Sequence, residues 1–309
     1  MFYAVSLNSC LDKSAALPFF TPDAPNRIQI QRTDVGGKGV NVARALHGLG
    51  EKAMLIGFDY AGAPVAAAMA KEGIGCTLLP IEGDMRVNLK IRETDTGRTL
   101  EISESGPPVS PERLSEIEDT LLRLVKPGDW VSLSGRLPPG APDSAYARLC
   151  EKLNERGCLT AADCDGAALH ACLDARPALI KPNAQEFAAL TGVDPRDTRK
   201  TAARCRALLQ RGIRWVCVSC GAEGAILCGP GGCWRCKAAS VQALGTQGAG
   251  DSMLAALMAA LSRGWPEEKA LPYACAAAGA SVMRPGTLLC RKEDAERLFA
   301  LQSGAEAIE

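Results

Sequence analysis

The stretch Gly245-Thr-Gln-Gly-Ala-Gly-Asp-Ser-Met253 joins a glycine-rich loop, the start of a helix and a carboxylate within nine residues. After Asp251, apolar residues recur at helical spacing until Gly264, which predicts a buried helix. Glycine lets the backbone approach an anion closely, and the unbonded amides of a first helical turn favour negative charge. The candidate anion hole consists of three successive residues, Gly248, Ala249 and Gly250.

Asp251 is the candidate catalytic base of this stretch. A carboxylate in the first turn beside an anion hole can take the proton of an attacking hydroxyl while the hole holds a migrating phosphoryl group. Asp251 could instead only cap the helix. A second motif, Gly36-Gly-Lys-Gly-Val-Asn41, favours the catalytic role of Asp251 over capping alone, because it again places glycines and a cation before a helix. It is not a Walker A loop, since no Ser or Thr follows Lys38.

The two motifs, in this order and at this separation, resemble the phosphofructokinase B (ribokinase-like) family of sugar kinases, and the resemblance covers nearly the whole chain. In that family the first motif grips the sugar and the second carries the catalytic base. The resemblance implies an α/β fold, with a three-layer α/β/α core around a mostly parallel sheet and a small β-sheet lid. We expect one kinase domain over residues 1–309, with lid strands inserted at about 13–33 and 85–104.

Length and composition agree with one globular unit. The chain has 309 residues, 47% of them hydrophobic, and no low-complexity linker divides it. Its net charge is zero, which gives no sign of a nucleic-acid partner, and no apolar run reaches the roughly 20 residues that span a bilayer. The segment Met1–Leu7 lacks the basic start of a signal peptide and is typical of a first strand. We therefore expect a cytoplasmic protein without membrane contact.

Two segments alternate polar and apolar residues, Arg86–Arg92 and Thr99–Ser103, and they flank the turn Asp95-Thr-Gly97. This pattern predicts a hairpin with one apolar face. Such strands match the lid of the family, which covers the sugar and often forms the dimer contact. The apolar face must be buried against something, so a homodimer through the lid is possible.

The sugar site is assigned from the resemblance. Asp12 is expected at the carboxyl end of the first strand, where open α/β sheets bind ligands, although on the residues alone it could be a turn residue. Phosphosugar kinases of the family carry Leu-Asn-Pro-x-x-Asp here, and this chain has Ser9 in place of the Pro. Arg86 begins an Arg-x-Asn-x-Lys pattern whose Arg contacts phosphate in the family, and its fork can bond two oxygens. The expected substrate-binding residues are Asp12, Gly37, Lys38, Gly39, Asn41, Arg86 and Lys90.

The run Lys181-Pro-Asn-Ala-Gln-Glu186 suits a helix start, where Asn183 and Glu186 would cap the helix. In the family, Lys-Pro-Asn-x-x-Glu holds the water shell of Mg²⁺ near the nucleotide. Magnesium keeps several waters and needs few protein ligands, so Asn183 and Glu186 would suffice. The resemblance implies ATP contacts at Lys181, Asn183, Ser219, Gly221, Gly224, Thr246, Gly248, Gly250 and Gly279.

Three departures from the family pattern stand out. Arg136 replaces the second Ser of Ser-Gly-Ser-Leu-Pro-Pro-Gly, and it could contact substrate phosphate or point outward. Gln247, where Val is usual, would put a polar group near the nucleotide phosphates. The segment after Gly57 is about two residues shorter than the pattern Gly-Phe-Leu-Gly would suggest.

Fourteen cysteines include two CxxC pairs, Cys217 with Cys220 and Cys233 with Cys236, at a spacing that resembles a zinc ribbon. The surrounding residues predict strands, in which residues three apart point to opposite faces. We therefore favour structural or incidental thiols over zinc, and we expect the other cysteines to be buried thiols rather than bridges.

The resemblance implies a kinase that uses ATP and Mg²⁺ to phosphorylate a phosphorylated ketohexose. The expected reaction converts fructose 1-phosphate to fructose 1,6-bisphosphate, with tagatose 6-phosphate as the alternative substrate. Two interpretations of other classes stay open. One is a catalytically silent sugar or nucleotide sensor, to which Gln247 and the shortened segment lend weight; the other is a zinc-dependent interaction module.

Overall fold

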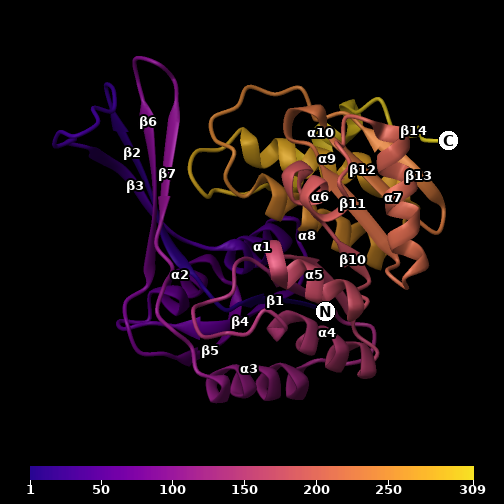
Figure 1. The fold of residues 1–309 in the computed structure, drawn as a ribbon, viewed down its shortest axis with the longest axis horizontal. Coiled ribbons are helices and arrows are strands. Elements are labelled where there is room, and N and C mark those ends of the chain that lie inside the picture. The colour runs from indigo at the N-terminus through magenta and orange to yellow at the C-terminus, as the bar shows by residue number, and fades with distance from the viewer.

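In the computed structural model, which describes residues 1–309, a ten-stranded sheet runs through the main body and a four-stranded sheet projects from it (Figure 1). The strands are β1 (Phe2–Ser6), β2 (Cys10–Leu17), β3 (Gln29–Gly36), β4 (Ala53–Asp59), β5 (Gly75–Pro80), β6 (Arg86–Glu93), β7 (Thr99–Ser103), β8 (Trp130–Ser134), β9 (Leu159–Asp163), β10 (Leu179–Ile180), β11 (Trp215–Ser219), β12 (Ala225–Gly229), β13 (Gly232–Cys236) and β14 (Glu306–Ala307). The helices are α1 (Lys38–Gly48), α2 (Pro64–Glu72), α3 (Pro111–Leu124), α4 (Ala145–Glu155), α5 (Gly166–Asp174), α6 (Ala184–Thr191), α7 (Thr198–Gln210), α8 (Ala249–Ser262), α9 (Glu267–Val282) and α10 (Lys292–Leu301), with a 3₁₀ turn at Gly221–Glu223.

The large sheet has the order β14-β13-β12-β11-β10-β9-β8-β1-β4-β5. It is parallel from β5 to β11 and antiparallel from there to β14. Every residue of β1 and β8 is buried, because helices cover both faces of a parallel sheet. The carboxyl ends of the neighbouring strands β1, β8, β9 and β10 therefore meet at one edge, where open α/β sheets bind their ligands.

Two apolar cores lie on the two faces of this sheet. One contains the buried sides of α1, α2, α8, α9 and α10, and the other those of α3 to α7. This three-layer arrangement, with a smaller sheet attached, confirms the predicted ribokinase-like α/β fold. No helix combines the length and the apolar character that crossing a membrane requires.

The small sheet, called the lid below, has the order β3-β2-β6-β7. Its β6–β7 pair is the predicted antiparallel hairpin. The sequence-based placement of Asp12 at the end of the first strand was wrong, because only Leu7–Ser9 separate β1 from β2 and Asp12 lies inside β2, opposite Asn88. The boundary was missed because the connection of three residues contains no glycine or proline that would mark a turn.

The cysteine quartet is divided between the two apolar cores. Cys217 and Cys236 are buried on the face covered by α8 and α9, whereas Cys233 and Cys220 pack on the other face. The strand geometry thus separates the thiols that a zinc ion would need together.

The expectation of free thiols rather than bridges was wrong for one pair. A disulfide joins Cys228 to Cys233, which lie directly opposite each other on β12 and β13 with their Cα atoms 4.1 Å apart. Cross-strand neighbours at this distance bring their side chains together, a relation that sequence spacing alone did not indicate.

Candidate active site

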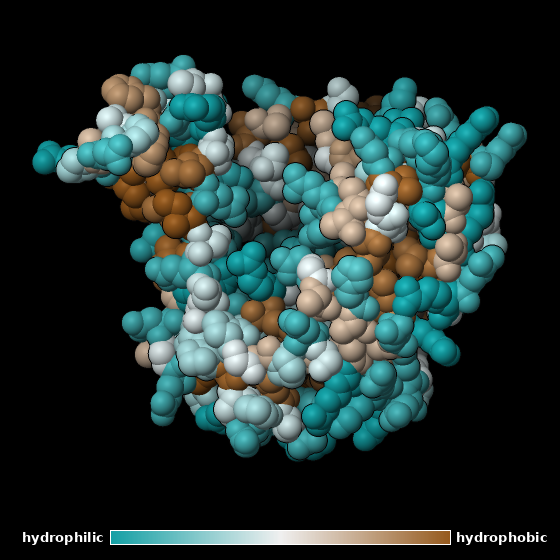
Figure 2. Space-filling view, viewed as in Figure 1, coloured by the Kyte–Doolittle hydropathy of each residue, from teal (hydrophilic) through white to brown (hydrophobic).

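A polar cleft of about 260 Å³ opens between the lid and the ligand edge of the large sheet, and no hydrophobic residue lines it. The lid contributes Asp12, Arg86, Asn88, Glu101 and Ser103. The main body contributes Ser6, Asn8, Gly37, Lys38, Asn41, Ser134, Gly135, Arg136, Asp165, Gln247 and Gly248. Figure 2 shows the hollow between the lid and the main body bordered largely by polar side chains. Such a lining suits a ligand rich in hydroxyl groups and negative charge.

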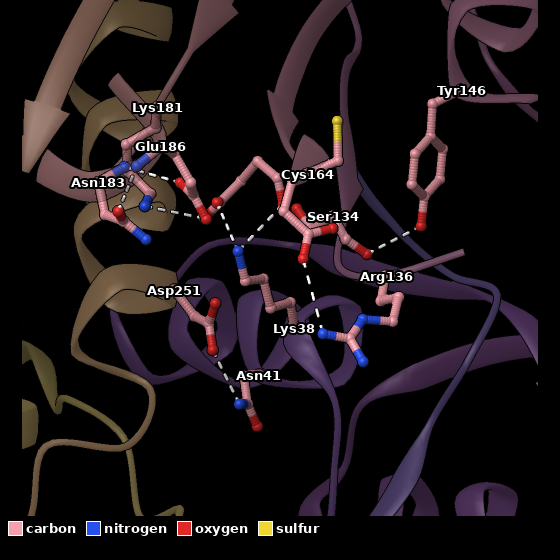
Figure 3. Close-up of polar contacts among 12 residues, drawn as sticks. Lys38, Asn41, Ser134, Arg136, Tyr146, Cys164, Lys181, Asn183, Glu186 and Asp251 are labelled. Atoms are coloured by element: carbon pink, nitrogen blue, oxygen red, sulfur yellow. Dashed lines mark hydrogen bonds and ion pairs between the residues drawn. The ribbon is translucent and has the colours of Figure 1, made fainter. Parts of the chain in front are cut away.

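The two glycine motifs meet at one side of this cleft. Gly248 precedes α8 with a φ of 73°, and a Cβ there would lie 2.2 Å from the Leu289 side chain, so both backbone and space require glycine. Asp251 follows in the first turn of α8, and the Asn41 Nδ2 donates to its Oδ2 over 2.8 Å (Figure 3). The motifs, 210 residues apart between these two side chains, therefore build one constellation.

Asp251 is 6% exposed, and its surroundings change its acidity. The pKa of Asp251 is raised to about 6, because burial and, to a lesser extent, the negative charge of Asp163 outweigh the opposing effects of Lys38, the Asn41 hydrogen bond and Lys181. The carboxylate is thus ionised at neutral pH and basic enough to accept a proton from a hydroxyl.

A buried chain of charges lies beside this carboxylate. Asp163, at the end of β9, accepts from Lys38 Nζ over 2.8 Å and pairs with Lys181 Nζ over 2.9 Å. Burial by itself would raise the pKa of Asp163, but the two ammonium groups outweigh it and hold the pKa below its usual value. Burial likewise opposes the charge of Lys38, yet Asp163 and Asp251 raise its pKa. Lys38 therefore stays protonated next to Asp251.

Sequence reasoning did not select Asp163 as a site residue. Its position at the carboxyl end of a buried parallel strand was the available signal, because this is the edge where ligands bind in such sheets. Lys38 and Lys181, which were expected to bind substrate and nucleotide, are brought together by this one carboxylate.

Asp12 is 7% exposed and is fixed within the lid. Its Oδ1 accepts from Asn88 Nδ2 over 3.0 Å and from Cys10 Sγ over 3.4 Å. Burial raises the pKa of Asp12, although both hydrogen bonds counteract it. Asn88 and Cys10, which sequence reasoning left out, thus hold the carboxylate that the cleft presents.

Gly36 leaves the space that Asp12 occupies, because a Cβ on Gly36 would lie 2.0 Å from Asp12 Oδ2. We expect Gly36→Ala to displace this carboxylate and to raise the KM for the sugar about 10-fold or more, with a smaller change in kcat. Initial-rate measurements over sugar concentration check this. Gly75→Ala is the matched control, since its Cβ would meet only Met54 Cε at an ordinary 3.8 Å. Equal KM values for both variants would contradict the assignment of Asp12.

Arg86 and Lys90, the two lid cations expected to bind the substrate, point to different places. Arg86 lines the cleft, with its Nε donating to the Asn8 carbonyl over 3.2 Å and its Nη1 to Asn88 Oδ1 over 2.6 Å. Lys90 does not line the cleft, and its Nζ lies 3.5 Å from Thr246 Oγ1 in the loop before α8. The structure therefore brings Arg86 to the predicted sugar side and Lys90 to the segment expected to bind nucleotide.

Asn183 and Glu186 cap α6 in both directions. Asn183 Oδ1 accepts from the Glu186 amide over 2.9 Å, and Glu186 Oε2 accepts from the Asn183 amide over 2.8 Å. The second carboxylate oxygen of Glu186 has no partner in the chain, and the Glu186 charge acts on Lys38. The chain offers no cluster of three or more acidic, His or Cys ligands, so a metal here would keep most of its waters, as Mg²⁺ does.

The other residues expected to contact ATP lie on neighbouring segments. Ser219 ends β11 and bridges to Asn183, and Gly221 and Gly224 follow with φ values of 58° and 97°. Gly279 is buried in α9, where a Cβ would lie 2.7 Å from Ala239 Cβ. Close packing against Ala239 thus accounts for this glycine. Gln247, expected near the nucleotide phosphates, lines the polar cleft beside Gly248.

Comparison with known proteins identifies the family to which the chain belongs. A family model described as pfkB family carbohydrate kinase matches residues 4–294. The chain is 36% identical over 267 residues to a 1-phosphofructokinase of Rhodobacter capsulatus, covering 84% of the chain and 83% of the relative. It is 30% identical over 289 residues to a D-tagatose-1-phosphate kinase of Bacillus licheniformis, covering 93% and 94%.

A solved structure of Escherichia coli phosphofructokinase-2, in complex with substrates and products, superimposes with a TM-score of 0.90 at 27% identity, covering 98% of this chain and 99% of the other. The match over both sheets agrees with the arrangement of lid and cleft described above. The chain is therefore an enzyme that transfers a phosphoryl group to an alcohol, and it belongs to the pfkB family of carbohydrate kinases.

Proposed function

We propose that this kinase transfers the γ-phosphoryl group of ATP to the free primary hydroxyl of a ketohexose 1-phosphate, with fructose 1-phosphate as the first candidate and fructose 1,6-bisphosphate as the product. The observation that carries the proposal is Asp251, held by Asn41 at the edge of a polar cleft that contains Lys38 and Arg86. The relative from R. capsulatus is named for this reaction.

A second candidate substrate is tagatose 1-phosphate, because the relative from B. licheniformis is named for it. Both sugars carry their phosphate on C1 and leave the hydroxyl of C6 free. The sequence-based alternative, tagatose 6-phosphate, differs in that its phosphate occupies C6. A ketohexose 1-phosphate with its free hydroxyl toward Asp251 agrees best with the named relatives.

In the proposed reaction, Asp251 removes the proton from the C6 hydroxyl, whose oxygen attacks the γ-phosphorus in line while the bond from that phosphorus to the β,γ-bridging oxygen breaks and ADP leaves. The amides of Gly248, Ala249 and Gly250 hold the charge that develops on the phosphoryl oxygens. Asp12, Gly37, Gly39 and Asn41 orient the sugar. Lys38 and Arg86 hold its C1 phosphate, and the lid excludes water so that transfer to sugar competes with hydrolysis.

The nucleotide side of the proposal rests on Lys181, Ser219, Gly221, Gly224, Thr246 and Gly279. We assign Lys90 to this side as well, because its ammonium lies at Thr246. Asn183 and Glu186 would hold Mg²⁺ through water, and the bound ion would neutralise charge on the transferring phosphates. The unpartnered oxygen of Glu186 is the atom available for this task.

The lid also supports a proposed homodimer. Ile30, Leu100 and Ile102 are 44%, 37% and 52% exposed on the lid face turned away from Arg86 and Asn88. Apolar side chains gather on the lid in Figure 2, and a second copy of the chain would cover them. We expect Ile102→Lys to shift sedimentation toward the monomer. The control Thr99→Lys, on the other face of the same strand, should leave the dimer intact; a wild type that sediments as a monomer would refute this interface.

The proposed activity is tested by ADP release with ATP and Mg²⁺ across fructose 1-phosphate, tagatose 1-phosphate, tagatose 6-phosphate, fructose 6-phosphate and unphosphorylated fructose. We expect the highest kcat/KM with a ketohexose 1-phosphate and loss of activity when EDTA removes the metal. Sugar binding without ADP release from any of the five would favour the sensor interpretation and refute catalysis.

A further inference from the structure

Arg136 is a cation of the cleft that the proposed reaction does not use. It follows Gly135, which leaves β8 with a φ of 94°, and it lines the cleft with a side chain that is 61% exposed. Its nearest acidic group is Asp165, whose Oδ2 lies 3.9 Å from Nη2, beyond hydrogen-bond distance. Lys38 and Arg86 are bound to chain oxygens, whereas the guanidinium of Arg136 keeps its donors free.

Asn8 links the loop of Arg136 to Arg86. Arg86 Nε donates to the Asn8 carbonyl over 3.2 Å, and Asn8 Nδ2 donates to the carbonyl of Leu137, the neighbour of Arg136, over 3.4 Å. The lid strand and the loop after β8 are thus fastened to the same residue. The two guanidinium groups consequently reach into one cleft from a common anchor.

The position of Arg136 relative to Asp251 suits a substrate that has a phosphate at one end and a reactive hydroxyl at the other. In the view of Figure 3, Lys38 lies between Asp251 and Arg136. A ketohexose 1-phosphate carries its phosphate and its free primary hydroxyl at opposite ends of the sugar. With the hydroxyl at Asp251, the phosphate comes to the side of the cleft where Arg136 stands.

We infer that Arg136 determines specificity for the phosphorylated sugar by binding the phosphate that the substrate already carries, and that Asp165 pairs loosely with it until that phosphate arrives. A guanidinium can bond two phosphate oxygens at once, and a phosphate dianion offers more acceptors than one carboxylate at 3.9 Å. This inference rests on the proposed function, since it assigns a phosphosugar to the same cleft.

The inference separates the roles of two neighbours with opposite charge. Removing Arg136 removes attraction to the phosphate, so affinity for the phosphosugar falls. Removing the charge of Asp165 frees the guanidinium from a competitor, so affinity rises. A residue that only stabilised the loop would not give opposite effects in these two variants.

The test measures the Kd of fructose 1-phosphate by calorimetry without ATP, for wild type, Arg136→Ser, Arg136→Lys and Asp165→Asn. We expect Arg136→Ser to raise the Kd about 10- to 100-fold, the range of a hydrogen bond to a charged group. Arg136→Lys should recover part of this loss, and Asp165→Asn should lower the Kd severalfold. The control Arg113→Ser removes an arginine paired with Glu116 on α3, outside the cleft, and should leave the Kd unchanged.

Initial rates complete the test. Arg136→Ser should raise the KM for the phosphosugar more than it lowers kcat, and it should not raise the KM for unphosphorylated fructose. A Kd for fructose 1-phosphate that Arg136→Ser leaves at the wild-type value overturns the inference, as does a wild type that binds no phosphosugar. Variants whose Kd values separate as expected, in a protein that releases no ADP, would support the inference and refute the proposed catalysis.

Discussion

Asp251→Asn is expected to lower kcat about 10³-fold while changing the KM for the sugar little, since a general base contributes roughly 10²- to 10⁴-fold. The amide keeps the shape of the carboxylate and can still meet Asn41, but it cannot take up the hydroxyl proton. ADP release under saturating sugar and ATP measures the loss. Asp174→Asn, at an exposed carboxylate at the end of α5, is the control and should retain wild-type activity.

The pH profile gives the same prediction an independent readout. Because the pKa of Asp251 is raised to about 6, the base is ionised above that pH and protonated below it. We expect kcat/KM to be level at neutral pH and to fall about tenfold per pH unit below about 6. The residual rate of Asp251→Asn should lack this decline. A variant that keeps more than a tenth of the activity would mean that Asp251 only belongs to the helix start.

The sequence predicted those parts of the site that depend on neighbours along the chain. Gly248 and Asp251 are three residues apart, so a glycine before a helix and a carboxylate in its first turn could be read directly. The capping of α6 by Asn183 and Glu186 is local in the same way. The lid hairpin followed from the alternation in β6 and β7, since two strands joined by a short turn pair with each other.

Relations between distant strands could not be predicted in this way. The contact of Lys38 and Lys181 with Asp163 brings together the start of α1, the end of β9 and the residue after β10. No local pattern in the sequence indicates that these three segments meet. The place of Asp12 depended on where one strand ends and the next begins, and three residues between them gave no signal. Lys90 shares a strand face with Arg86, yet it lies four residues further along β6, outside the cleft and next to Thr246.

Asp163→Asn is expected to lower the free energy of unfolding by about 3–5 kcal/mol, the cost of removing one partner from a buried charge pair. Asp163 is 2% and Lys181 is 4% exposed, so the substitution leaves a buried ammonium group without its counter-charge. Urea denaturation at pH 7 measures the change. Asp129→Asn, which loses the pair with the amino group of Met1, is the control and should cost less because Met1 is a partly exposed terminal residue, with 31% of its side chain exposed.

The same substitution should also move the pH dependence of catalysis, and in a direction that instability cannot mimic. Asp163 raises the pKa of Asp251, whereas Lys38 and Lys181 lower it. Asp163→Asn removes the negative charge and keeps both positive ones, so the pKa of Asp251 falls and the acid limb of kcat/KM shifts below pH 6. Lys38→Met removes a positive charge instead and should shift the limb upward. Shifts of opposite sign would show that this charge chain sets the basicity of Asp251, whereas a limb that stays in place in both variants would refute it.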